Sequence, residues 1–181
     1  MKRLLIDMDD VICENGFIRM INEFLGTNYK SEDANSYYVN DLIPKDKFEE
    51  WVKFFEEKNV YDYVNIVKDA PEVIEKHDIY IITAYIFRDK PEISGSQLKN
   101  KFDYLTKNLP FIDPKKFIFL SDKELVDADI RIDDSVDKLK GQAEMKLLFT
   151  AYHNKNIADD ELKEKKLTRV NSWKEIEKIL L

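Results

Sequence analysis

The stretch Leu4-Leu5-Ile6-Asp7-Met8-Asp9 is the most informative part of this chain for its fold. Three apolar residues, enough for a short buried strand, run directly into two carboxylates separated by one residue. Four later apolar runs are equally short and lack polar alternation, at residues 79–82, 117–120, 130–132 and 146–149. Such runs are typical of parallel strands, because those strands are covered on both faces.

Helical patterns lie between the later runs. Pro71 stands at a plausible first turn. Residues 96–108 place Leu98, Phe102 and Leu105 at helical spacing on one face. Near the C-terminus, Ser172 followed by Glu175 is typical of a helix cap. Alternating strands and helices predict an α/β fold, a Rossmann-type doubly wound parallel sheet.

Residues 14–68 interrupt this alternation directly after the first run. The segment carries two apolar helical patterns, one with Phe17, Ile18, Ile21, Phe24 and Leu25, the other with Phe48, Trp51, Val52, Phe54 and Phe55. We therefore expect a catalytic core of residues 1–13 and 69–181, with a small helical cap of residues 14–68 inserted after the first strand. The alternative is that both helices simply continue the core. For Phe48, Trp51 and Phe54 we expect a packing role.

Composition limits the possible partners. The chain has 181 residues, a net charge of −7 and a single cysteine, Cys13, so no intrachain disulfide can form. An acidic chain is a poor ligand for nucleic-acid polymers, although it can still bind a small phosphate ester beside a metal. No stretch approaches the ~20 apolar residues of a membrane span. We expect a cytoplasmic protein with a small-molecule partner and no membrane or nucleic-acid contact; whether it forms a homodimer stays open.

Polar side chains gather where the predicted strands end. In an open parallel sheet the carboxyl ends of the strands meet at one crevice. Six residues are therefore expected to converge there: Asp7, Asp9, Thr83, Lys123, Asp133 and Asp134.

Each of these residue types has a use in phosphoryl transfer. Asp7 and Asp134 offer the hard oxygen ligands that Mg²⁺ prefers, and a metal beside Asp7 keeps its carboxylate nucleophilic. Asp9 can give a proton to a leaving alkoxide and take one from water. Thr83 can donate its hydroxyl to phosphate, while Lys123 supplies a positive charge. Taken singly, each has a plainer reading; Asp133 and Asp134, for example, could cap a helix starting near Ser135.

The ordered set Asp7-Met8-Asp9-Asp10-Val11, Thr83, Lys123 and Ile132-Asp133-Asp134 resembles the haloacid dehalogenase-like (HAD) phosphohydrolase superfamily over residues 1 to about 150. Stretches at residues 37–39, 55–59, 121–123, 149–154 and 172–173 are similar to its 5'(3')-deoxyribonucleotidase branch. The resemblance implies a Mg²⁺-dependent enzyme that hydrolyses the phosphate monoester of (deoxy)ribonucleoside monophosphates through an aspartyl-phosphate.

The resemblance also implies a role for each residue. Asp7 would be the nucleophile and a metal ligand. Asp9 would be the acid/base and would bind the metal through its backbone carbonyl. Asp134 would be the third protein ligand of the metal, and Asp133 would support a metal-bound water.

Further roles concern the substrate. Thr83, the backbone N–H of Ala84, and Lys123 would hold the phosphate. Cap positions would contact the nucleoside: Tyr37, Tyr38, Val39, Phe55 and Tyr61.

Three departures from the branch leave the substrate open. Ala84 stands where Ser is usual, Asp10 stands where Gly is common, and Phe17 is only a candidate for the base-stacking Phe. A sugar phosphate is therefore the first alternative substrate. A two-component receiver domain is a second alternative. A receiver, however, carries its acidic pair on the first strand, whereas the last motif of this chain is the acidic pair Asp133-Asp134. A catalytically silent phosphate-binding module is a third, and the intact motif set argues against it.

Overall fold

A six-stranded parallel sheet forms the centre of the molecule. The structure, a computed structural model, describes residues 2–34, 39–84 and 91–181. The strand order is β5-β4-β1-β6-β7-β8, and every neighbouring pair is parallel. The strands are β1 (Leu4–Ile6), β4 (Ile79–Thr83), β5 (Phe117–Phe119), β6 (Ile130–Asp133), β7 (Met145–Phe149) and β8 (Thr168–Val170). All five predicted apolar runs are strands; β8 was not predicted.

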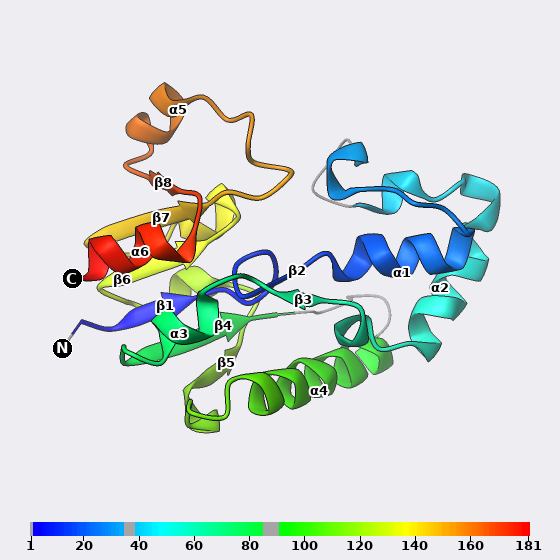
Figure 1. Cartoon of the computed structure of the whole chain (residues 1–181), viewed down its shortest axis with the longest axis horizontal. Coiled ribbons are helices and arrows are strands. Elements are labelled where there is room, and N and C mark those ends of the chain that lie inside the picture. Colours follow the sequence, from blue (N-terminus) through cyan, green and yellow to red (C-terminus); the bar gives the residue numbers. More distant parts are fainter. Residues whose placement is uncertain (1, 35–38, 85–90) are drawn as a thin grey trace.

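The order of the strands creates a crevice beside β1. From β1 the chain moves outward through β4 to β5, then crosses to the opposite side of β1 for β6, β7 and β8 (Figure 1). Ligand sites in open α/β sheets lie at such a reversal, outside the carboxyl ends of the strands. The predicted doubly wound sheet is confirmed.

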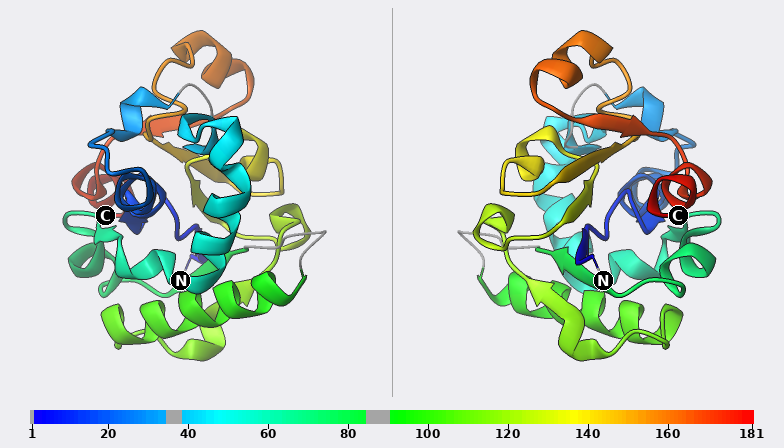
Figure 2. Two further views of the ribbon diagram at one scale, coloured as in Figure 1. Left: turned by 90° about the vertical axis from the view of Figure 1, so that its right-hand side faces the viewer. Right: turned by 90° about the vertical axis from the view of Figure 1, so that its left-hand side faces the viewer.

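Helices cover the sheet. They are α3 (Ala70–Ile74), α4 (Pro91–Asn108), α5 (Asp159–Glu164) and α6 (Trp173–Leu180). Helices α3 and α6 lie side by side on one face (Figure 2). The predicted cap of α6 is confirmed, because the hydroxyl of Ser172 accepts a bond from the Glu175 N–H at 3.3 Å. Among the described residues, no helix combines the length and apolarity that a membrane span needs.

The buried face of α4 differs from the predicted one. The helix begins at Pro91 rather than at residue 96, and Phe102, expected inside, is 39% exposed. Leu105 is buried as predicted and Leu98 is half-buried, but the other buried positions include Gln97 and Lys101. The prediction was wrong for Phe102 because apolar spacing normally marks the inward face, whereas here Lys101 turns inward to meet a carboxylate from a distant part of the chain.

Two longer helices occupy the segment between β1 and β4. They are α1 (Gly16–Leu25) and α2 (Phe48–Glu57), with short 3-10 helices η1 (Ser31–Asp33), η2 (Val39–Leu42), η3 (Lys45–Lys47) and η4 (Val60–Asp62). Strand β2 (Cys13–Glu14) pairs antiparallel with β3 (Asn65–Ile66), which joins the two ends of the segment. Figure 1 shows α1 and α2 beyond the carboxyl ends of the strands, at the end of the molecule away from both termini. Dividing the chain into a core and a cap stays an interpretation of this arrangement.

Aromatic side chains pack α1 against α2. The ring of Phe24 lies 5.5 Å from that of Trp51 and 5.4 Å from that of Phe54, between centroids. Trp51 is buried and Phe54 half-buried, as expected for a packing role. Phe48 is 44% exposed, so that expectation was wrong for this residue. Phe48 is the first residue of α2. Because helical side chains point toward the N-terminus of the helix, its ring extends beyond the start of α2.

Candidate active site

The segment after β1 turns sharply and presents two carboxylates. The Asp7 N–H donates to the Ile132 carbonyl at 2.9 Å, so Asp7 continues the sheet. The Met8 carbonyl then accepts from the N–H groups of Val11, Ile12 and Cys13, at 3.4, 2.8 and 3.1 Å. Asp10 lies in this turn with φ 54°, in the left-handed region that favours glycine. The turn directs Asp7, Asp9 and Asp10 toward the strand ends.

A tryptophan from α6 holds this turn in place. The indole N–H of Trp173 donates to the Val11 carbonyl at 2.8 Å, and the side chain is 1% exposed. Its ring packs against Phe149 at the end of β7, with 6.4 Å between centroids. The C-terminal helix therefore fixes a segment some 160 positions earlier in the chain.

Lys123 lies between two carboxylates. It follows β5 as the first residue of η6 (Lys123–Leu125), and its Nζ is 2.7 Å from Asp7 Oδ1 and 2.6 Å from Asp133 Oδ2. Burial alone would lower the pKa of Lys123, but the charges of Asp7 and Asp133 outweigh burial and raise it. Lys123 therefore stays protonated. The guanidinium of Arg131 supports this loop by donating to the Lys123 carbonyl at 3.1 Å.

Three carboxylates crowd together beside Lys123. One oxygen each from Asp7, Asp133 and Asp134 lies within 4.8 Å of the others, and all three side chains are buried. Burial, and then the charge of Asp7, raises the pKa of Asp133 to about 6. Burial, and then Asp133, raises the pKa of Asp134. A divalent cation would relieve this repulsion, and an all-carboxylate donor set fits a hard ion such as Mg²⁺.

Asp134 is held from behind by the segment that follows β7. His153 Nε2 lies 2.6 Å from Asp134 Oδ2. The side-chain amide of Asn154 donates to the backbone carbonyls of Asp134 and Phe149, both at 2.7 Å. Burial lowers the pKa of His153. These contacts fix both the backbone and the carboxylate of Asp134.

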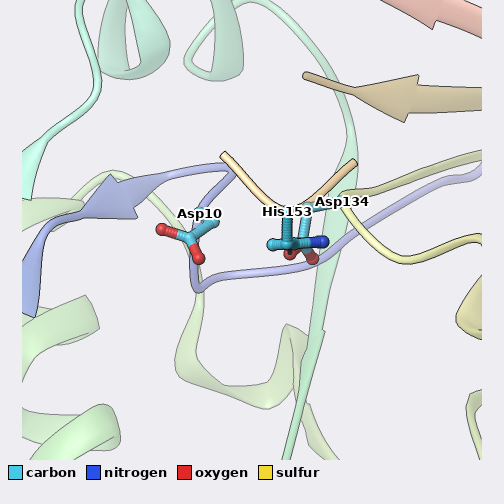
Figure 3. A group of neighbouring side chains, drawn as sticks. All are labelled: Asp10, Asp134 and His153. Carbon is cyan, nitrogen blue, oxygen red and sulfur yellow. Dashed lines mark hydrogen bonds and ion pairs between the residues drawn. The ribbon is translucent and has the colours of Figure 1, made fainter. Parts of the chain in front are cut away.

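Asp10 lies beside this pair. One ligand atom each from Asp10, Asp134 and His153 falls within 4.8 Å of the others, and Figure 3 shows the three side chains together. Burial, and then the charge of Asp134, raises the pKa of Asp10. The sequence alone indicated no role for His153 or Asn154, although both lie in the stretch 149–154 that resembles the deoxyribonucleotidase branch.

Asp9 belongs to neither of these two clusters, and Lys101 of α4 contacts it. Lys101 Nζ bonds Asp9 Oδ2, Thr83 Oγ1 and, at 3.2 Å, the Ala84 carbonyl oxygen. On the other side, the Tyr61 hydroxyl donates to Asp9 Oδ1 at 3.0 Å. Because Thr83 accepts from the ammonium, its own hydroxyl hydrogen is left for a different acceptor, such as a phosphate oxygen. Lys101 was missed from the sequence because nothing in a helical pattern distinguishes it from a surface lysine.

A cavity of about 50 Å³ is lined by Asp9 and by residues of α1 and η4. Of the predicted nucleoside contacts, Val39 and Tyr61 line it, and so does Phe17. Phe55 is not among the lining residues; it stacks on Phe17, with 5.8 Å between ring centroids. Tyr37 and Tyr38 lie outside the described residues.

A second cavity, of about 400 Å³, lies next to the first. The two share Asp10 and Tyr152 in their linings. Lysines from both sides line the second cavity, Lys30 from the segment before η1 and Lys155 from the segment after β7. Asp9 borders only the smaller cavity, called the inner cavity below; the larger one is called the outer cavity.

Comparison with known proteins agrees with this geometry. The family model described as 5' nucleotidase, deoxy (pyrimidine), cytosolic type C protein matches residues 1–181. A Staphylococcus aureus (strain Mu50) protein provisionally named a 5'(3')-deoxyribonucleotidase is 31% identical over 186 residues, covering 99% of this chain and 96% of the relative. A 5'(3')-deoxyribonucleotidase of Bacillus subtilis (strain 168) is 28% identical over 194 residues, covering 99% of both chains.

Solved structures show the same fold at much lower identity. A haloacid dehalogenase-like family hydrolase from Xanthomonas campestris superimposes with a TM-score of 0.53 at 12% identity, covering 99% of this chain and 94% of the other. A HAD family hydrolase from Deinococcus radiodurans R1 gives a TM-score of 0.50 at 15% identity, covering 99% and 95%. The resemblance noticed in the motifs is therefore confirmed. The chain therefore has the fold of haloacid dehalogenase-like hydrolases, and it belongs to the 5' nucleotidase, deoxy (pyrimidine), cytosolic type C family.

Proposed function

We propose that this chain is a Mg²⁺-dependent phosphatase that hydrolyses the phosphate monoester of (deoxy)ribonucleoside monophosphates, with Asp7 as the nucleophile. One observation carries the proposal: Asp7 lies against the cation of Lys123 and beside Asp133 and Asp134, while Asp9 faces a separate cavity. Two carboxylates two residues apart thus have different surroundings, which is what a nucleophile and an acid/base need.

Asp7, the backbone carbonyl of Asp9, and Asp134 would hold the Mg²⁺, with Asp133 supporting a water on it. The ion would offset negative charge on the phosphate and keep Asp7 ionised. The chemistry of the donors supports this assignment, because carboxylate and carbonyl oxygens are hard ligands. His153 would keep the Asp134 carboxylate oriented, as outer hydrogen bonds do in metal sites.

The chain's own residues would then carry two displacements at phosphorus. In the first, a carboxylate oxygen of Asp7 forms a bond to phosphorus as the ester P–O bond breaks. The leaving oxygen keeps the bonding electron pair and takes a proton from Asp9. In the second, water attacks the same phosphorus and gives its proton to Asp9, which releases phosphate and restores the Asp7 carboxylate. Lys123 and the hydroxyl of Thr83 would hold the phosphate oxygens.

The nucleoside would lie in the inner and outer cavities. Phe17, Tyr61 and Tyr152 border them, and stacking of a base on an aromatic ring is worth roughly 1–3 kcal/mol. The inner cavity, about 50 Å³, is much smaller than the ~300 Å³ or more that small-molecule sites usually offer. The nucleoside would therefore extend into the outer cavity, or the α1–η4 segment would move outward to admit it.

A phosphate-release screen tests the proposal. Its substrates are deoxy- and ribonucleoside monophosphates, sugar phosphates and an aryl phosphate, each with Mg²⁺ and with a chelator. We expect release from nucleoside monophosphates that depends on the cation. Activity on sugar phosphates alone would overturn the nucleotidase assignment and favour the alternative HAD phosphatase. A homodimer and a cytoplasmic location stay predictions.

A further inference from the structure

Lys101 is a completely buried cation within the candidate active site. It lies on the inward face of α4, and its side chain is 0% exposed. Its Nζ is surrounded by acceptors from two strand ends: Asp9 Oδ2 after β1, and Thr83 Oγ1 and the Ala84 carbonyl at β4. Burial of an ammonium group costs several kcal/mol unless it is paired and hydrogen-bonded, so this lysine depends on these partners.

The exposure of the two paired side chains differs sharply. The Asp9 side chain is 37% exposed, toward the cavity, while Lys101 has no exposed surface at all. Lys101 therefore reaches Asp9 from the protein side and leaves its other side open to a substrate. In this arrangement Lys101 cannot itself touch the substrate, so any effect on the reaction passes through Asp9.

Bonds to Thr83 and Ala84 hold the ammonium group of Lys101 in this position. Thr83 is the last residue of β4 and Ala84 follows it directly. Residues 79–81 of β4 pair with β1, and Thr83 pairs with Phe119 of β5. The two bonds therefore fix the ammonium group relative to the sheet. Tyr61 then restrains the second oxygen of Asp9. The carboxyl group is thus held at both oxygens, in one orientation.

We propose that Lys101 is a positioning residue for Asp9: it fixes the Asp9 carboxyl group toward the leaving oxygen of the substrate and stabilises the carboxylate that remains after the proton has moved. This inference rests on the proposed phosphatase function. It adds a residue to that mechanism from a helix that bears none of the sequence motifs.

The leaving group separates this role from a structural one. An alkoxide such as the nucleoside oxygen leaves poorly without a proton, whereas a nitrophenolate is stable enough to leave without one. Asp9 also serves the second displacement, which is the same for both substrates, so the contrast must be read from kcat/KM, which reports only the steps up to departure of the leaving group. In kcat/KM, a residue that acts through the general acid matters for the nucleotide and hardly for the aryl phosphate. A residue that merely stabilises the fold, or that binds phosphate, affects both substrates alike.

The experiment compares Lys101→Met, which keeps the length of the side chain, with Lys107→Met, an exposed lysine of the same helix. Steady-state kinetics are measured with a nucleoside monophosphate and with 4-nitrophenyl phosphate. Since general acid–base catalysis contributes ~10²–10⁴-fold, we expect Lys101→Met to lower kcat/KM for the nucleotide by roughly 10–100-fold. For the aryl phosphate we expect kcat/KM to stay within about threefold, with Lys107→Met like wild type on both.

A second measurement distinguishes the positioning role from a general loss of folding. In Asp9→Asn the acid is absent, so adding Lys101→Met should lower nucleotide turnover by no more than about threefold further. Equal losses of kcat/KM on both substrates in Lys101→Met, or additive losses in the double variant, would overturn the positioning role. If wild type hydrolyses only other alkyl phosphates, the nucleotidase assignment fails, and the same comparison on those esters still tests Lys101. A wild-type protein inactive on every ester would refute both.

Discussion

The ammonium group of Lys123 lies 2.7 Å from a carboxylate oxygen of Asp7, although 116 positions separate the two residues in the chain. The parallel sheet produces this contact, because Asp7 follows β1 and Lys123 follows β5 on the same edge. The pairing keeps one oxygen of Asp7 beside a cation that a phosphate group can share.

Replacing the proposed nucleophile tests the covalent step. Asp7→Asn should reduce phosphate release to background, because a neutral amide does not attack phosphorus at a useful rate. The fold should survive, which circular dichroism can verify. Asp127→Asn, the same change at an exposed site, serves as the control. Turnover of Asp7→Asn at the wild-type rate would refute the aspartyl-phosphate route.

His153 should matter for metal binding rather than for folding. Its ring nitrogen is 2.6 Å from Asp134, and losing such an outer contact typically costs about 10–100-fold in metal affinity. We expect His153→Asn to raise the Mg²⁺ dissociation constant, measured by calorimetry without substrate, by that factor. His77→Asn, at the other histidine of the chain, should leave it unchanged. An unaltered constant in His153→Asn would show that Asp134 does not need this support.

Stability should depend on pH and Mg²⁺ together. The folded-state pKa values of Asp10, Asp133 and Asp134 are raised, that of Asp133 to about 6, against ~4 in an unfolded chain. The metal-free native state therefore binds more protons than the unfolded one. Its stability should fall as pH rises from about 4 through about 6 and above.

Mg²⁺ should reverse this trend, because it binds the ionised carboxylates. At a hundredfold excess over Kd a ligand adds about 2.7 kcal/mol, or roughly 5–10 °C in Tm for a chain of this size. Calorimetric melting at about pH 5 and about pH 7.5, with and without Mg²⁺, measures the effect. The increase in Tm should be clearly larger at the higher pH; an increase independent of pH would argue against binding at these carboxylates.

The indole of Trp173 should rigidify the turn that carries Asp9 and Asp10. Trp173→Phe keeps an aromatic ring but removes the bond to the Val11 carbonyl, which should cost about 1–3 kcal/mol. Hydrogen exchange should become faster at residues 8–13. Trp51→Phe, at a buried tryptophan of α2 that packs against Phe24 of α1, is the control and should leave those amides protected. Equal exchange in both variants would show that α6 does not hold the turn.

Much of the sheet was predictable because short apolar runs without alternation have few other uses in a chain of this size. Strand β8 was missed, since residues 168–170 include only one apolar side chain. The cap of α6 was predictable because a Ser hydroxyl bonded three residues ahead is a local interaction. Phe48 and Phe102 were misplaced, because apolar spacing does not say how far a partner element extends over a helix.

The order of residues along the chain was enough to predict which side chains stand at the strand ends, because parallel strands share a carboxyl edge: Asp7, Thr83, Lys123, Asp133 and Asp134. The surroundings of Asp9 and Asp134 depend on contacts between distant segments and became visible only in three dimensions. Lys101 and His153 are ordinary polar residues in a helix and a loop until a distant carboxylate lies within reach. Whether a charge is buried depends on its partner in space, and no local pattern records that partner.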